Sequence, residues 1–421
     1  MAMIKAPRGT NDVLPSDSYK WRYVESVADK TAASAGYKEI RFPTFEETEL
    51  FTRGVGDTTD IVQKEMYTFE DKGGRSMTLR PEGTASAVRL SLENGLLGGA
   101  LPLKLYYKIN VFRYDKPQAG RYREFNQTGM ELYGAKSPFA DAELISLAKL
   151  FLNNLGIEGV LLKINSIGCP KCRADYQEAL RAYFTAHTDE LCDTCKSRLQ
   201  RNPMRILDCK SPQDILLAKN APKITDYLCD ECREHYSAVK NALSSVGIEY
   251  EEDSGLVRGL DYYTKTVFEF IDTNTSLAVA AGGRYDGLIE ELGGKPTPGI
   301  GFACGVERLF PLIPDFGEDT VPDIYIASIG SAAAETAFEI AEKLRKNGVF
   351  VETDLMERSV KAQMKYADKT GAKYTVVLGD EELEKGEAEL RNMKDGSACS
   401  VNIRNIEKLT AILKNEIHIC D

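Results

Sequence analysis

A cysteine-rich segment interrupts sequence that otherwise has the pattern of a sheet domain, and this interruption constrains the fold more than any other feature. Residues 165–250 hold seven of the ten cysteines and have the pattern of helices. Aromatic-rich strand patterns lie on both sides, before residue 164 and again from 256 to 312. We therefore predict one domain from residues 1–164 and 251–318, with a helical, cysteine-rich insertion at 165–250.

A second boundary lies at a linker containing three prolines, PLIPDFGEDTVPD. With 421 residues the chain is too long for a single core. After the linker, strand patterns (VPDIYIASIG, VFVETDLM, KYTVVLGD) alternate with helical patterns (AAAETAFEIAEKLRKNG, SVKAQMKYADKTGA), and NIEKLTAILKNEI has the pattern of a closing helix. This alternation predicts a small parallel α/β domain over residues 322–421.

Composition narrows the class of protein. Hydrophobic residues make up 43% and charged residues 28%, as in soluble globular proteins. No apolar run approaches the ~20 residues that span a bilayer, and the first residues lack the apolar region of a signal peptide. We expect a cytoplasmic protein with no membrane partner and with reduced cysteines. The net charge of −11 argues against a globally basic nucleic-acid binder, although not against a local basic patch.

The insertion carries three CxxC pairs. CPKC and CDTC are separated by 19 residues, a spacing typical of zinc sites. CDEC is a third pair, and Cys209, His187 and His235 lie nearby. Two interpretations remain open, a structural zinc site and a reduced thiol-rich helical domain. The candidate zinc ligands are Cys169, Cys172, Cys192 and Cys195.

Polar residues gather in several strand-like segments. In TLRPEGTASAVRL, Glu82 could cap the following helix or receive a substrate ammonium group. In VFRYDKPQAGRYREFNQTGMELYG, basic residues surround a Pro/Gly loop, which suits either a solvated hairpin tip or a groove for polyphosphate or nucleic acid. Further along this segment Gln127 and Glu131 share one face of a strand. Those two side chains face either solvent or a ligand.

Two later segments combine glycine with arginine. In LVRGLDYYTKTVFEF, Arg258 precedes Asp261 and two tyrosines, and the simplest interpretation is a partly exposed strand in which Arg258 pairs with Asp261. In PGIGFACGVERLF, glycines would let a nucleoside lie against the backbone while Arg308 reaches a phosphate. Each segment alone is a weak signal.

Together, these segments resemble the histidyl-tRNA synthetases of bacteria, which are class II aminoacyl-tRNA synthetases. The resemblance rests on LRPEGTA, FR…GRYREFNQ…E, LVRGLDYY, AGGRYDGL and GFACGVERL in this order, and it extends from about Lys5 to the C-terminal helix. It implies an α+β fold, with an antiparallel catalytic sheet, an insertion, a C-terminal α/β anticodon-binding domain and a homodimer. Many such proteins lack the cysteines found here, which leaves the insertion's chemistry open.

The resemblance also implies roles for individual residues. Arg113 and Arg258 would be catalytic, acting on the histidine carboxylate and the α-phosphate of ATP, which is used with Mg²⁺. Glu131 and Tyr263 would hydrogen-bond the imidazole. The implied histidine-binding residues are Glu82, Gly83, Thr84, Arg113, Gln127, Glu131, Arg258, Tyr262 and Tyr263. The implied ATP-binding residues are Arg113, Arg121 and Arg308.

The implied function is that of a histidine–tRNA ligase, which forms histidyl-adenylate and diphosphate from L-histidine and ATP and then transfers histidine to the 3′ end of tRNA(His). The alternative is a non-catalytic, synthetase-like regulatory subunit of histidine biosynthesis. Such subunits lack the anticodon-binding domain and have degraded catalytic segments. Residues 322–421 and the arginines of the catalytic segments are all present here, which favours the enzyme.

The C-terminal domain needs a local surface to bind tRNA, because it is acidic overall. Residues 321–421 contain 14 Lys and Arg against 18 Asp and Glu. Lys361, Lys365 and Lys369 are spaced four apart and would form one stripe on a helix. The stripe either contacts the tRNA backbone or is a solvated helix face.

Overall fold

The structure is a computed structural model that describes residues 3–56, 59–118, 120–209 and 211–414. It divides into two units, Met1–Gly317 and Glu318–Asp421, and each is described by itself. Within the described ranges, no helix is long and apolar enough to cross a membrane.

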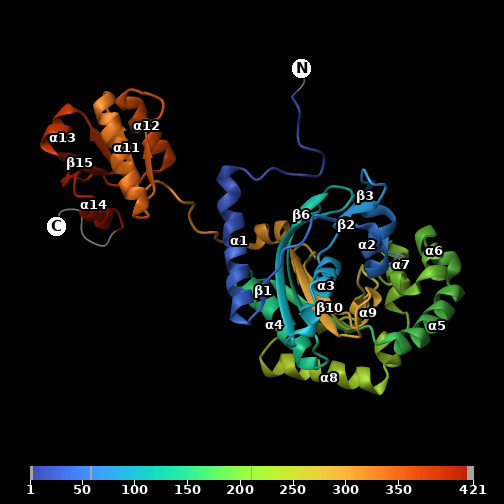
Figure 1. Ribbon diagram of the computed structural model, residues 1–421. Coiled ribbons are helices and arrows are strands. Elements are labelled where there is room, and N and C mark those ends of the chain that lie inside the picture. Colours follow the sequence, from blue (N-terminus) through green and yellow to red (C-terminus); the bar gives the residue numbers. More distant parts are fainter. Residues whose placement is uncertain (1–2, 57–58, 119, 210, 415–421) are drawn as a thin grey trace. The chain divides into compact units, whose positions relative to one another are not determined.

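The first unit is built on a large, mostly antiparallel sheet (Figure 1). Among the described residues its eight strands lie in the order β1-β5-β6-β11-β10-β9-β7-β8. The two outermost pairs, β1 with β5 and β7 with β8, are parallel, and the pairs between them are antiparallel. The strands are β1 (Lys38–Glu39), β5 (Leu103–Phe112), β6 (Glu124–Tyr133), β7 (Val160–Ser166), β8 (Glu251–Glu252), β9 (Thr264–Asp272), β10 (Ala278–Arg284) and β11 (Gly299–Gly305). This confirms the α+β class.

One face of the sheet is covered by three helices, α1 (Pro15–Ser34), α4 (Pro138–Asn154) and α8 (Asp230–Ser245). Their apolar side chains and Met130, Phe268 and Phe302 of the sheet form one buried core. Ser137 caps α4 by accepting a hydrogen bond from the Phe139 amide, with Pro138 in the first turn. Because side chains alternate along a strand, the neighbours of Met130 on β6 point to the opposite face.

The opposite face carries smaller elements that close over it. The turn from β4 (Ser76–Leu79) into α3 (Thr84–Glu93) brings Glu82 and Thr84 to this face. The elements are a second sheet of β2 (Phe45–Glu47), β4 and β3 (Tyr67–Glu70), and the helices α2 (Thr48–Val55), α3 and α9 (Leu288–Glu291). The short helix α10 (Val306–Leu309) follows β11, and its Val306 and Leu309 belong to the core formed with α1, α4 and α8.

The insertion between β7 and β8 is helical, as predicted. Besides α8 it contains α5 (Pro170–Ala186), α6 (Asp193–Arg201) and α7 (Pro212–Lys219), drawn in green in Figure 1. Buried residues of α5, such as Leu180 and Phe184, belong to one apolar cluster with Tyr262 and Tyr263, which precede β9, and Tyr285, which follows β10. The insertion therefore shares an apolar core with residues next to β9 and β10 of the large sheet.

The second unit is an α/β domain with a mixed sheet, ordered β13-β12-β14-β15-β16 in the described part of the chain. The parallel strands β13, β12 and β14 match the predicted alternation, whereas the antiparallel β15 and β16 were not predicted. The elements are β12 (Ile324–Ser328), α11 (Ser331–Lys346), β13 (Val351–Thr353), α12 (Val360–Thr370), β14 (Tyr374–Leu378), α13 (Asp380–Lys385), β15 (Glu387–Asn392), β16 (Ala398–Asn402) and α14 (Ile406–Leu413).

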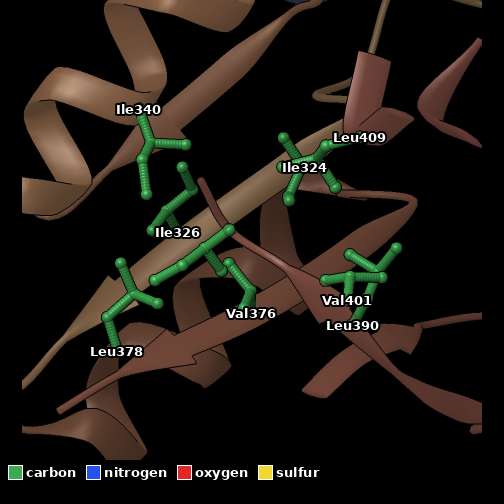
Figure 2. A pocket seen from close by; sticks show the side chains of 9 residues that line it. Ile324, Ile326, Ile340, Val376, Leu378, Leu390, Val401 and Leu409 are labelled. Atoms are coloured by element: carbon green, nitrogen blue, oxygen red, sulfur yellow. The ribbon is translucent and has the colours of Figure 1, made fainter. Parts of the chain in front are cut away.

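Figure 2 shows the core of this domain, where aliphatic side chains from the strands, α11 and α14 surround a cavity of about 10 Å³. Its lining, which includes Ile326, Val376 and Leu390, carries no polar side chain, so the cavity is part of the core. The predicted closing helix extends beyond α14, and its last residues lie outside the described ranges.

Candidate active site

Glu131 is the centre of a buried polar network on the sheet. One carboxylate oxygen accepts hydrogen bonds from Thr84 Oγ1 at 2.8 Å and from the Tyr107 hydroxyl at 2.9 Å, and the other accepts from the Tyr285 hydroxyl. The side chain is fully buried. Burial raises the pKa of Glu131 to about 8, although the three hydroxyl donors oppose this rise. A carboxyl group of this kind recognises a polar ligand that can donate to it.

Glycines make room for this network. A Cβ at Gly83 or Gly129 would lie 2.5 or 2.4 Å from the Tyr107 ring, and a Cβ at Gly301 would overlap the Glu131 carboxylate. Gly129 pairs with Tyr107 across β5 and β6, and Gly301 pairs with Glu131 across β6 and β11. These positions therefore accept glycine alone, because any side chain would collide with the ring or the carboxylate.

Glu82 caps α3, as one of its two interpretations predicted. Its carboxylate accepts the Thr84 amide at 2.7 Å and the Ala85 amide at 2.8 Å, and the Tyr262 hydroxyl lies 3.5 Å away. Burial raises the pKa of Glu82, while the two backbone hydrogen bonds and the charge of Arg113 oppose this. Each carboxylate oxygen can accept further donors, so the cap does not exclude a bound ammonium group.

Three tyrosines form a wall beside Glu131. The ring centroids of Tyr262 and Tyr263 are 4.7 Å apart, and both rings lie near Tyr285, at 5.6 and 6.4 Å. Tyr262 and Tyr263 precede β9 and are buried. Gln127, on the same face of β6 as Glu131, has a buried Oε1 without a hydrogen-bond partner in the described part of the chain. An unpartnered buried acceptor is costly, which suits an atom that a ligand satisfies.

Arg258 does not pair with Asp261, so the simplest interpretation of its segment is wrong. Its guanidinium forms an ion pair with Glu269 of β9, and Asp261 pairs with Arg205 of the insertion at 2.9 Å. The Arg258 Nε is buried and, among the described residues, has no hydrogen-bond partner. The guanidinium lies 5.9 Å from the Tyr263 ring centroid. Arg258 is thus held next to the tyrosine wall with a donor still available.

Four arginines lie near enough for their charges to interact: Arg113, Arg121, Arg258 and Arg308. Burial lowers the pKa of Arg308, and the charges of Arg121, Arg113 and Arg258 lower it further. Arg258 is held by the Glu269 carboxylate and Arg121 by the Asp115 carboxylate, while Arg113 donates to Pro81 O and Arg308 to Gly120 O and Ala278 O. A group of arginines of this kind suits a multiply charged anion such as a polyphosphate.

The cysteines form two groups, and neither is the predicted set. The thiols of CPKC lie with those of CDEC, whereas the thiols of CDTC lie with Cys209 and the Asp214 carboxylate. The prediction that Cys169, Cys172, Cys192 and Cys195 share one zinc ion is therefore wrong. The fold brings the N-termini of α5 and α8 together, and sequence spacing between neighbouring pairs does not reveal this.

Tyr107 and Tyr285 were not selected from the sequence, although both bond Glu131. Tyr285 lies within the quoted AGGRYDGL segment. A signal for Tyr107 was available, because the polar run Gln127-x-Gly129-x-Glu131 has a glycine where the facing strand places a large ring. Of the residues that were selected, Glu82, Thr84, Gln127, Tyr262 and Tyr263 lie around Glu131 on this face of the sheet, and the arginines Arg113, Arg121, Arg258 and Arg308 lie near one another.

Comparisons with known proteins agree with this geometry. A family model described as histidyl-tRNA synthetase matches residues 9–309, and one described as an anticodon binding domain matches residues 323–413. The chain is 54% identical to a histidine–tRNA ligase of Caldicellulosiruptor saccharolyticus, over 98% of this chain and 100% of that protein. It is 53% identical to the histidine–tRNA ligase of Acetivibrio thermocellus, over 95% and 98%. The crystal structure of apo S. aureus histidyl-tRNA synthetase superposes with a TM-score of 0.82 at 41% identity, covering 97% and 100%. The chain therefore belongs to the histidyl-tRNA synthetase family.

Proposed function

We propose that the face around Glu131 and the four arginines is where the chain activates L-histidine with ATP, before the histidyl group passes to the 3′ end of tRNA(His). The observation that carries this proposal is one juxtaposition. A pocket of carboxylates and tyrosines lies directly beside guanidinium groups that repel one another. An amino acid with a polar ring fits the first part, and a nucleoside triphosphate fits the second.

In the activation step, a carboxylate oxygen of histidine attacks the α-phosphorus of ATP, and the bond to the diphosphate breaks. Both reactants are anionic, so this step needs positioned cations more than it needs a base. Arg113 and Arg258 are proposed to contact the carboxylate and the α-phosphate. Arg121 and Arg308 are proposed to hold the outer phosphates, which Mg²⁺ would also neutralise.

Histidine selection is assigned to the network around Glu131. Its carboxylate would accept the imidazole N–H, with Tyr263 and Tyr285 beside the ring. Glu82, Gly83, Thr84 and Gln127 would hold the amino-acid end; the free Oε1 of Gln127 is a ready acceptor for the ammonium. A buried polar pocket rejects apolar amino acids strongly, because they leave its groups unpaired.

The test is ATP–pyrophosphate exchange with each amino acid in turn. Exchange with histidine alone would support the assignment of both halves of the site. Exchange driven equally by another amino acid would contradict the role of Glu131, and no exchange with any of them would contradict the role of the arginines.

The regulatory-subunit alternative is less supported. Those subunits lack an anticodon-binding domain, whereas residues 323–413 here match one. We also propose that the chain acts as a homodimer, which sedimentation at micromolar concentration checks directly. A purely monomeric, active protein would contradict this proposal.

A further inference from the structure

We propose that the insertion holds two structural zinc ions at two separate sites. We also propose that the elements around these ions anchor residues 256–263, which we call the pocket loop. The first site is Cys169, Cys172, Cys229 and Cys232. The second is Cys192, Cys195, Cys209 and Asp214. In each group, all four ligand atoms lie within 4.8 Å of one another.

The first site has the dimensions of a tetrahedral thiolate centre. With Zn–S bonds of about 2.3 Å, sulfur atoms around zinc lie about 3.8 Å apart. The Cys169 and Cys172 sulfurs are 3.6 Å apart, and the Cys229 amide donates to Cys172 Sγ at 3.2 Å. Cys169 and Cys229 are the residues that precede α5 and α8. Each CxxC turn therefore lies at the N-terminus of a helix, where the helix dipole favours thiolates.

The second site combines three thiols with a carboxylate, a donor set that zinc accepts. The Cys192 and Cys209 sulfurs are 3.9 Å apart, and Cys209 Sγ lies 3.0 Å from Asp214 Oδ2. Asp214 is fully buried. Its contacts within the described ranges are thiols and the Cys192 amide, with no lysine or arginine among them. A buried carboxylate without a cationic partner is costly, and a metal ion supplies the missing charge.

Residues next to both sites form hydrogen bonds or ion pairs with the pocket loop. Arg173, which follows Cys172 on α5, donates to the Tyr263 carbonyl at 3.2 Å. Near the end of α6, Arg205 pairs with Asp261 at 2.9 Å and Asn202 donates to the same oxygen at 3.4 Å. The loop that carries Arg258 is therefore anchored by α5, next to the first site, and by the turn after α6, which lies between Cys195 and Cys209 of the second site. None of the cysteines lies in the sequence segments that form the pocket. Their positions in the sequence therefore suggest that metal loss would leave the pocket intact, whereas these contacts connect both sites to the pocket loop.

The first test is metal content in full-length protein purified without chelator. We expect two equivalents of zinc per chain by elemental analysis. Cys169→Ser/Cys172→Ser and Cys192→Ser/Cys195→Ser should each lose one equivalent, whereas Cys399→Ser, in the C-terminal domain, should keep two. Less than half an equivalent in the wild-type protein would overturn the proposal, and so would one equivalent or the presence of iron instead.

A second measurement needs only the wild-type protein, so it tests the proposal even if the cysteine variants fail to fold. Titration with a mercurial reagent should release two zinc ions to a chromogenic indicator as the thiols of the insertion react. Cobalt(II) reconstitution should give sulfur-to-cobalt absorption bands from two sites. Release of one ion, or cobalt bands that saturate at one equivalent, would overturn the second site.

The second test separates anchoring from metal binding and rests on the proposed function for its readout. Arg205→Ala should keep two zinc ions but raise the histidine KM about tenfold, as for one charged hydrogen bond. The ATP KM should change less, and Arg205→Lys should recover part of the loss. Arg181→Ala, an exposed arginine on α5, is the matched control. Unchanged histidine KM in Arg205→Ala would overturn the anchoring role, whereas absence of exchange in the wild-type protein would overturn the proposed function and leave the zinc count standing.

Discussion

Tyr285 donates its hydroxyl hydrogen bond to Glu131 across an intervening strand. Glu131 is on β6 and Tyr285 follows β10, with β11 between them. The contact is possible because Gly301 of β11 has no side chain to block it. A single missing Cβ thus joins two distant segments into one polar network, and this is the network that we propose selects histidine.

We predict that Glu131→Gln raises the histidine KM by about tenfold or more, with a smaller change in kcat. The amide keeps the shape of the side chain but cannot become the carboxylate that favours an imidazole N–H donor when the ligand binds. Pyrophosphate exchange at varied histidine concentration measures the effect. Glu124→Gln, on the same strand but hydrogen-bonded to Asn110 near the surface, should behave as wild type. An unchanged KM, together with unchanged discrimination against histidine analogues, would place Glu131 outside the pocket.

The same substitution predicts a pH effect on stability. The pKa of Glu131 is raised to about 8 in the folded protein, whereas glutamate in an unfolded chain titrates near about 4.3. Its stabilising contribution is therefore fully present below pH ~4.3 and is lost as the pH rises through about 8. The glutamine of the variant cannot ionise.

Thermal unfolding without ligands measures this difference. The Tm of Glu131→Gln minus that of wild type should increase between pH ~5 and pH ~8.5. Only the wild-type protein releases a proton from this side chain when it unfolds, so a rising pH favours the unfolding of the wild type alone. A difference that stays constant over this range would mean that Glu131 is already ionised in the empty site.

The sequence predicted which residues share a face of a strand, but not which side chains form hydrogen bonds with one another in the site. Alternation along β6 placed Gln127 and Glu131 on one face, because a strand's side-chain period is fixed locally. The partners of Glu131 depend on which strands become neighbours, and no local pattern encodes that order. The resemblance named Glu131 and Tyr263 as the groups that hydrogen-bond the imidazole, and it did not reveal that Tyr107 and Tyr285 bond Glu131.

Arg258 is expected to act on the transition state. Arg258→Ala should lower histidine-dependent pyrophosphate exchange by about a hundredfold or more, as for loss of one positioned electrostatic donor, with a weaker effect on histidine binding. Arg75→Ala removes an exposed arginine that pairs with Asp71 and serves as the control. If exchange by Arg258→Ala stayed within a few-fold of wild type, the proposed role would be wrong.

Long-range pairing also explains why the cysteines were grouped incorrectly. CPKC and CDTC have the spacing of a zinc site, yet α5 and α6 carry them to different groups. CDEC reaches CPKC only because α8 packs back against the sheet. The antiparallel strands β15 and β16 were missed for a local reason. Buried and exposed residues alternate along β15, but its Glu and Ala residues are depleted in strands and favour helices, so the alternation was not recognised as a strand.

The last prediction concerns the lysine stripe of α12. Lys361, Lys365 and Lys369 are all exposed, whereas Gln363 and Ala367 of the same helix are buried. The stripe therefore faces solvent in an otherwise acidic domain, which leaves it available to phosphates. Replacing all three lysines with glutamine should raise the tRNA KM in aminoacylation.

The salt dependence identifies the cause of that rise. Each phosphate contact that is lost should flatten the slope of log K against log salt by about 0.7 to 0.9, because fewer counterions are released on binding. Histidine-dependent pyrophosphate exchange should not change, since it needs no tRNA. A control with the same charge change replaces Lys343, Lys346 and Lys394, which are exposed elsewhere in the domain. If both triple variants charged tRNA alike at every salt concentration, the stripe would be an ordinary solvated helix face, and the tRNA surface would have to lie on another part of the domain.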